Sequence, residues 1–191
     1  MRPALLLLTL SACQASSPAE PPRVVISREG SPDLVLTRTS TGCTWGASEV
    51  KLEGNRSWTS GGLDGAPHPT GRWYHVRDPR FPQLDGARFV DEPGPPRRLS
   101  LLDPAGVPLF RIKVDGDRAT VAGPDGAPRA AFERTADGVR ALGPDGTPTG
   151  RVARGTTDPV LVALLIGHDI VPDANAILAC EHLALSTPVK K

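Results

Sequence analysis

Short segments in the second half of the chain alternate between polar and apolar side chains. In residues 109–114 (Leu-Phe-Arg-Ile-Lys-Val) every second side chain from Phe110 to Val114 is apolar. Side chains of a β-strand point alternately to its two faces, so this period predicts a strand with one buried face. The same kind of pattern occurs at residues 98–102, 118–122, 129–134, 139–142 and 149–154.

Turn-forming residues recur between these segments with a period of 20. Pro fixes φ at a turn corner, Asp accepts local backbone hydrogen bonds, and Gly adopts the conformations that reverse the chain. One period holds two strands and two turns, so the repeat predicts a β-meander of successive hairpins. The turn copies lie at 103–108, 123–128 and 143–148, with weaker copies at 63–67 and 84–87, and the phased glycines are Gly65, Gly86, Gly106, Gly126 and Gly146.

The amino-terminal half is β-like but less regular. Together with the repeat, its segments make about ten or eleven antiparallel strands. So many strands in one sheet must curl, split into two layers or close. We therefore expect a mainly β fold, built as a curled sheet or a barrel. The additional candidate strands are residues 23–28, 34–39, 49–52, 71–77 and 87–90.

The carboxyl-terminal part changes from strand to helix periodicity. Asp158 can cap a helix and Pro159 fits its first turn. The segment 160–166 is apolar on every face and is followed by Gly167, so it predicts a short helix that must be surrounded by protein. A second, amphipathic helix is expected from about residue 174 to 185, capped by Asp173, with Ile177, Leu178, Ala184 and Leu185 as its apolar stripe.

Repeated strand pairs with Asp-x-x-Gly or Pro-Asp-Gly turns, followed by a short all-apolar helix, are similar to the tubby-like and phospholipid-scramblase-like β-barrels. The resemblance covers about residues 63–167. It implies a curled antiparallel sheet around one buried helix, and a lipid-handling module as a function class. No lipid-binding or calcium-binding residue of that family can be placed in this sequence.

The first thirteen residues have the order of a secretory signal peptide, with Arg2 before a short apolar run. The run ends in Leu10-Ser11-Ala12-Cys13, which resembles the lipobox of bacterial lipoproteins. The resemblance implies cleavage before Cys13, a diacylglycerol thioether on its sulfur and an acyl chain on the new amino terminus. An ordinary cleaved signal remains the alternative, whereas the run is too short for a membrane-spanning helix.

The signal predicts where the domains begin and where the protein resides. Residues 1–12 form the signal, 13–22 a lipidated Cys13 with a flexible tether, 23–157 the β domain and 158–187 a helical segment packed on or in it. Because Gln14 rather than Asp follows the cysteine, the resemblance implies the outer membrane rather than the inner one.

Composition narrows the function classes. The formal net charge of +1 gives no general attraction to nucleic acid. The 20 glycines and 21 prolines, in a chain of 39% hydrophobic content, indicate many turns rather than disorder.

Two cysteines remain once Cys13 is assigned to lipid. In an oxidising compartment, leftover thiols tend to pair, so we expect a Cys43–Cys180 disulfide. Two separate buried thiols are the alternative.

Large aromatic residues are few and gather in the amino-terminal half. Trp45, Trp58, Trp73 and Tyr74 could fill the core of a curled sheet, or could anchor a protein partner or a sugar ring if exposed. The core use is the simpler interpretation, and partner binding stays open.

Catalytic and metal-binding motifs are not found in the sequence. The four histidines, His68, His75, His168 and His182, have no zinc-site spacing, and the cysteines form no Cys-x-x-Cys pair. His168-Asp169 could orient a catalytic imidazole, and Cys43 could act as a nucleophile, but no family signature surrounds either.

These observations favour a membrane-anchored cell-envelope lipoprotein with a non-enzymatic binding or scaffolding role, as part of an envelope assembly. We expect no cofactor apart from the lipid on Cys13, and no metal or nucleic acid. The expected partners are the membrane, through the anchor, and another envelope protein. A lipid-handling β-barrel is the alternative, favoured by an open apolar cavity beside residues 160–166. An enzyme is the third class, favoured by His75 or His168 in a deep cleft beside a carboxylate or Cys43.

Overall fold

A computed structural model of the chain describes residues 22–60, 62–68, 71–76, 82–169 and 172–186. It confirms a mainly β, antiparallel meander followed by two carboxyl-terminal helices. The strands are β1 (Arg23–Arg28), β2 (Ser31–Arg38), β3 (Gly42–Trp45), β4 (Ser48–Glu53), β5 (Arg56–Thr59), β6 (Leu63–His68), β7 (Gly71–Val76), β8 (Ala87–Glu92), β9 (Arg97–Leu102), β10 (Pro108–Asp115), β11 (Arg118–Ala122), β12 (Pro128–Thr135), β13 (Gly138–Leu142) and β14 (Pro148–Arg154).

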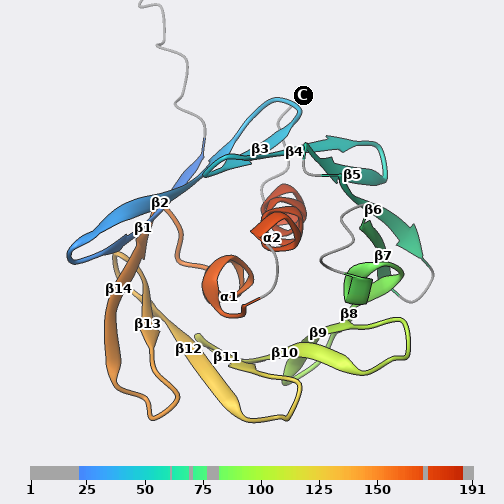
Figure 1. Cartoon of the computed structure of the whole chain (residues 1–191). Coiled ribbons are helices and arrows are strands. Elements are labelled where there is room, and N and C mark those ends of the chain that lie inside the picture. Colours follow the sequence, from blue (N-terminus) through green and yellow to red (C-terminus); the bar gives the residue numbers. More distant parts are fainter. Residues whose placement is uncertain (1–21, 61, 69–70, 77–81, 170–171, 187–191) are drawn as a thin grey trace, which may run out of the picture.

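The strands pair in sequence order, and the sheet closes into a barrel (Figure 1). The closing pair is β1 with β14, with Ile26 opposite Ala153. Both of these side chains are buried, which places the apolar face of each strand toward the barrel interior. No strand edge is left open at this junction, so the meander needs no partner to complete its hydrogen bonds.

Three strands were not anticipated by the alternation of side chains. β3 and β5 have only four residues each, too few for the pattern to stand out. β6 contains Gly65, which the repeat assigns to a turn, and that assignment is wrong. Gly65 pairs with Ser57 and Tyr74 in the sheet. A Cβ built on it would lie 2.5 Å from the Ser57 hydroxyl oxygen, so close approach rather than chain reversal requires glycine there.

The carboxyl-terminal copies of the repeat form tight turns as expected. Gly106, Gly126 and Gly146 have φ of +85°, +79° and +83°, the left-handed region that favours glycine. Successive hairpins of an antiparallel meander turn at alternate ends of the barrel. The turns at 103–107, 123–127 and 143–147, with the β1–β2 turn, therefore all lie at one end, named the repeat-turn end below.

The first helix, α1 (Pro159–Ile166), lies inside the ring of strands (Figure 1). Asp158 caps it by accepting a hydrogen bond from the Val160 N–H at 2.9 Å. All its residues from Pro159 to Leu165 are buried. The barrel thus supplies the apolar surroundings that a helix with no polar face needs.

The second helix, α2 (Pro172–Ser186), also lies inside the ring (Figure 1). The expectation of an amphipathic helix is wrong, because residues 174–181 are buried without interruption. In this run, Glu181 bonds with Ser57 of the barrel wall, and the side-chain amide of Asn175 donates to the Leu165 carbonyl of α1 at 3.3 Å. The helix begins one residue before Asp173, so this residue lies in the first turn rather than outside it. The resemblance implied one buried helix, and the structure has two.

Candidate functional site

Two cavities open at the repeat-turn end of the barrel. α1 runs toward this end, because β14, which precedes it, ends at the opposite one. The chain leaves the helix there through Gly167, His168 and Asp169. The cavities measure about 340 and 390 Å³, and these three residues and Arg129 line both of them. Each volume lies in the lower part of the range of small-molecule pockets.

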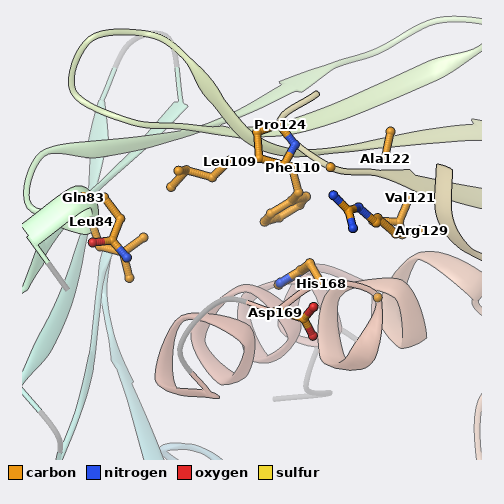
Figure 2. Close-up of a pocket in the computed structure, with 12 residues that line it drawn as sticks. Gln83, Leu84, Leu109, Phe110, Val121, Ala122, Pro124, Arg129, His168 and Asp169 are labelled. Atoms are coloured by element: carbon orange, nitrogen blue, oxygen red, sulfur yellow. The ribbon is translucent and has the colours of Figure 1, made fainter. Parts of the chain in front are cut away.

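The first cavity lies between the end of α1 and the loop before β8 (Figure 2). Gln83 and Leu84, from the short 3₁₀ helix η1 (Pro82–Leu84), line one side. Phe110 and Pro124 line the sheet side. The lining therefore combines apolar side chains with the polar groups of Gln83, Arg129, His168 and Asp169.

His168 forms the boundary between helix and sheet in this cavity. Its ring stacks on Phe110, with ring centroids 3.9 Å apart and planes inclined by 8°. Both ring nitrogens are buried and have no hydrogen-bond partner among the described residues. Burial lowers the pKa of His168 to about 3, and the nearby Leu164 carbonyl opposes this only in part. The imidazole is therefore neutral at physiological pH.

The second cavity is more basic. Arg28 and Arg151 line it together with Arg129, and Thr149 adds a hydroxyl. Its apolar lining comes from both sheet and helix and includes Phe132, Ala141, Leu142 and Ile166. Three cations thus face one carboxylate, Asp169, around a partly apolar hollow.

Gly167 allows the end of α1 to lie against the sheet. A Cβ there would come within 2.5 Å of the Ala163 carbonyl oxygen and 2.7 Å of a Val121 methyl carbon. The sequence marks this glycine as a helix stop. The structure adds that its missing side chain brings His168 up to the wall.

Polar residues of α2 are held by the wall at two levels. Near the repeat-turn end, Asp173 accepts hydrogen bonds from the hydroxyls of Ser48 at 2.5 Å and Thr59 at 2.9 Å. Deeper in the barrel, Ser57 donates to Glu181 at 2.5 Å, and Arg72 lies 3.4 Å from the same carboxylate. These pairs fix the rotation of α2.

The Glu181 group is electrostatically unusual. Burial raises the pKa of Glu181 above its ordinary value, while the Ser57 hydroxyl and the Arg72 charge oppose the change. Burial also raises the pKa of Tyr74, and the Glu181 charge adds to the effect. The Tyr74 hydroxyl is buried and has no hydrogen-bond partner among the described residues.

The two helices are joined at the other end of the barrel. Asp158, the cap of α1, lies 2.6 Å from Nε2 of His182 on α2. Burial alone would raise the pKa of Asp158, but the hydrogen bond and charge of His182 lower it below its usual value. The pair couples the start of one helix to the last turns of the other.

The Cys43–Cys180 disulfide is confirmed. It joins β3 to α2 across 137 residues of sequence, with the two Cα atoms 5.8 Å apart. Cys43 is therefore not available as a nucleophile, and that hypothesis is wrong in this oxidised form of the protein.

The aromatic residues are divided between core and wall. Trp45 is 7% exposed and Tyr74 2%, so both belong to the core. Trp58 is partly exposed on β5, and the side chain of Trp73 lies outside the described residues. Trp45, Trp58 and Tyr74 line neither of the two cavities. Partner binding through these residues stays a prediction.

Other sequence expectations fall partly outside the described residues. These include Cys13, the signal, and the side chains of His68 and His75. In the part of the chain that the structure describes, no helix is long and apolar enough to cross a membrane. The described residues also hold no cluster of three or more His, Cys, Asp or Glu side chains placed to bind a metal ion.

The basic residues of the second cavity were not singled out from the sequence. A signal was present, since Val24, Ile26 and Arg28 occupy alternate positions of one strand. The first two are buried, so alternation alone would predict an inward-facing arginine; in the structure Arg28 is exposed at the end of β1 and lines the cavity mouth.

Comparison of the chain with protein-family models, with curated proteins and with solved structures finds no match.

Proposed function

We propose that this protein is a cell-envelope lipoprotein whose barrel is a non-enzymatic binding module, with its binding site at the repeat-turn end. The single observation that carries the proposal is the pair of adjoining cavities around Gly167, His168 and Asp169. Concave, largely apolar hollows with a few polar groups are the usual form of small-molecule and peptide sites.

Several features favour binding over catalysis. His168 has a pKa of about 3, too low for an efficient general base at neutral pH. Its imidazole is stacked on Phe110. The hydroxyl that lines the second cavity, that of Thr149, donates to the Ala141 carbonyl at 3.2 Å rather than to a base.

The lipid-handling alternative has less support. It calls for an apolar cavity beside residues 160–166, but Val160 to Leu165 are all buried against protein. Ile166, at the very end of α1, lines the second cavity. Two helices lie inside the ring (Figure 1), and Val160 to Leu165 belong to the buried core between helices and strands.

The envelope location rests on the lipobox-like sequence at Cys13, and the Cys43–Cys180 disulfide is in keeping with an extracytoplasmic compartment. The lipid anchor would hold the module at the membrane as a component or accessory of an envelope assembly.

Site-specific photo-crosslinking in the native envelope tests the proposed site. A photoreactive p-benzoylphenylalanine placed at Pro124 or Pro144 probes the repeat-turn end. The same probe at Asp117 or Asp137, in turns of the opposite end, is the matched control. We expect a discrete crosslinked product from the first pair and none from the second. Products of equal yield at both ends, or at neither, would contradict a binding site in the cavities.

A further inference from the structure

Given the binding role proposed above, on which this inference rests, we propose that the second cavity binds a small organic anion. The ligand class is a carboxylate, phosphate or sulfonate carried on an apolar body. Arg28 and Arg151 hold the anionic group, with Arg129 at the rim, and the apolar lining receives the body.

The two principal arginines are direct cross-strand neighbours. Arg28 on β1 pairs with Arg151 on β14, in the continuous register that also pairs Ile26 with Ala153. Ile26 is 3% and Ala153 1% exposed, and each lies two positions from one of the arginines. Both arginines line the second cavity at the mouth, where the pairing of β1 with β2 is irregular between Ile26 and Arg28 and the Arg28 side chain is exposed.

This arrangement is unfavourable without an anion. Directly opposed residues of an antiparallel pair have Cβ atoms about 5 Å apart, and like charges there are destabilising. Within the described part of the chain, no ion pair or side-chain hydrogen bond joins either Arg28 or Arg151 to a carboxylate. A bound anion would supply two charge-assisted, fork-shaped contacts and remove the repulsion.

Arg129 can join them at little cost. It forms an ion pair with Asp125, at 3.4 Å, and both side chains are more than half exposed. Exposed pairs of this kind contribute little to stability, so the guanidinium can turn from Asp125 toward a ligand. Asp169 also lines the cavity, and it leaves the set of charged lining residues with a net charge of +2 (three arginines less one aspartate).

The rest of the cavity suits an apolar body. Phe132, Leu142 and Ile166 line it, and the neutral imidazole of His168 adds no charge. A volume of about 390 Å³ accommodates a compact aromatic or short-chain ligand. Inorganic phosphate would contact the arginines but would leave the apolar lining of the cavity without a contact.

Two fluorescent probes distinguish binding of the ligand's anionic group from binding of its apolar body. 8-Anilino-1-naphthalenesulfonate carries an anionic sulfonate, and N-phenyl-1-naphthylamine has the same rings without it. Both are titrated against the full-length chain with Cys13→Ser, without detergent, as the common background. In R28Q/R151Q we expect at least a tenfold loss of affinity for the sulfonate, with the neutral probe changed less than twofold.

The control variant is R118Q/R154Q, which removes two exposed arginines of β11 and β14 that line neither of the two cavities. It should leave both titrations unchanged. An equal loss in this variant would show general electrostatic attraction and overturn the cavity assignment. Tighter binding of the neutral probe than of the sulfonate by wild-type protein would overturn it as well.

Thermal unfolding guards against a folding defect. Without ligand, R28Q/R151Q should melt at or above the wild-type temperature, because it loses a like-charge pair. Octyl phosphate should raise the melting temperature of wild type but not that of the variant, and inorganic phosphate should raise it less. If Pro144 gives a crosslinked product but the protein does not bind the sulfonate probe, the proposed binding function is retained and the proposal of an anionic ligand is overturned. Binding of the unlipidated chain to anionic vesicles, lost in R28Q/R151Q, would instead assign these arginines to a lipid surface and overturn the inference.

Discussion

Loss of the Cys43–Cys180 disulfide should destabilise the protein strongly. The bond connects residues 137 apart in sequence. In the chain-entropy model, a closed loop of this length restricts the unfolded chain by about 5 kcal/mol. Typical domains are stable by only about 5–15 kcal/mol, so this one bond represents a large fraction of the total.

The structure also indicates where the weakened protein would open. The bond ties α2 to β3, and both cysteines are fully buried. Without it, α2 is retained by apolar packing and by the bonds of Asp173 and Glu181. We therefore expect a fold that still forms but unfolds at lower denaturant, with a measured loss of about 2–5 kcal/mol.

Urea unfolding, followed by tryptophan fluorescence and far-ultraviolet circular dichroism, measures this loss. The Cys13→Ser chain is compared with and without reductant, and with C43A/C180A in the same background. Because the reduced unfolded chain is less compact, its m-value should also be larger than that of the oxidised protein. A change below about 0.5 kcal/mol with an unchanged m-value would refute the entropic reasoning. Two titratable thiols in unreduced, denatured protein would refute the bond itself.

Three further predictions concern helix ends, a buried carboxyl and the anchor. Asp158→Ala should destabilise the protein by about 1–2 kcal/mol, because α1 loses its cap. Asp158→Asn keeps the cap, so urea unfolding should show a smaller loss of stability than for Asp158→Ala. Wild type should lose stability as the pH falls through the lowered pKa of Asp158, and both variants should abolish this pH dependence. Since the pKa of Glu181 is raised in the fold, the unfolded chain binds fewer protons above pH ~4.5. The free energy of unfolding should therefore fall as the pH rises from the ordinary pKa of Glu181 to its raised value in the fold. Glu181→Gln should flatten this pH dependence. Metabolic labelling with radioactive palmitate should mark the wild-type protein, and labelling that persists in Cys13→Ser would exclude that residue as the lipidation site.

Local patterns predicted the parts of the fold in which local and tertiary requirements coincide. The strand at 109–114 and the turns at Gly106, Gly126 and Gly146 follow from alternation and from turn chemistry that each segment carries by itself. The segment 160–166 was placed inside the protein because no orientation gives it a polar face. The disulfide followed from a cysteine count rather than from geometry.

The errors arise where distant residues change the meaning of a local signal. Gly65 has the sequence of a turn, yet it is required in a strand because Ser57 and Tyr74 crowd its α-carbon. Asp173 and Glu181 give α2 a polar appearance, and groups distant in sequence, the hydroxyls of β4 and β5 and the Arg72 guanidinium of β7, match these carboxylates. The Arg28–Arg151 pair needs the register of the first strand against the last, which no local window contains.

Strand direction relates the cavities to the anchor. β1 begins at Arg23, at the end of the barrel opposite the repeat turns, and runs toward Arg28 at the mouth. If Cys13 carries lipid, the nine residues 14–22 span at most about 30 Å before that strand begins. The Asp158–His182 pair lies at the same end as Arg23, so a lipid anchor on Cys13 would attach the barrel by the end at which the two helices are joined. The cavities would then open at the end farther from the attachment point, where a soluble anion or a partner in the aqueous compartment could reach them. A lipid substrate would have to travel around the barrel to do so, which makes the direction of the first strand a further reason to prefer a soluble ligand.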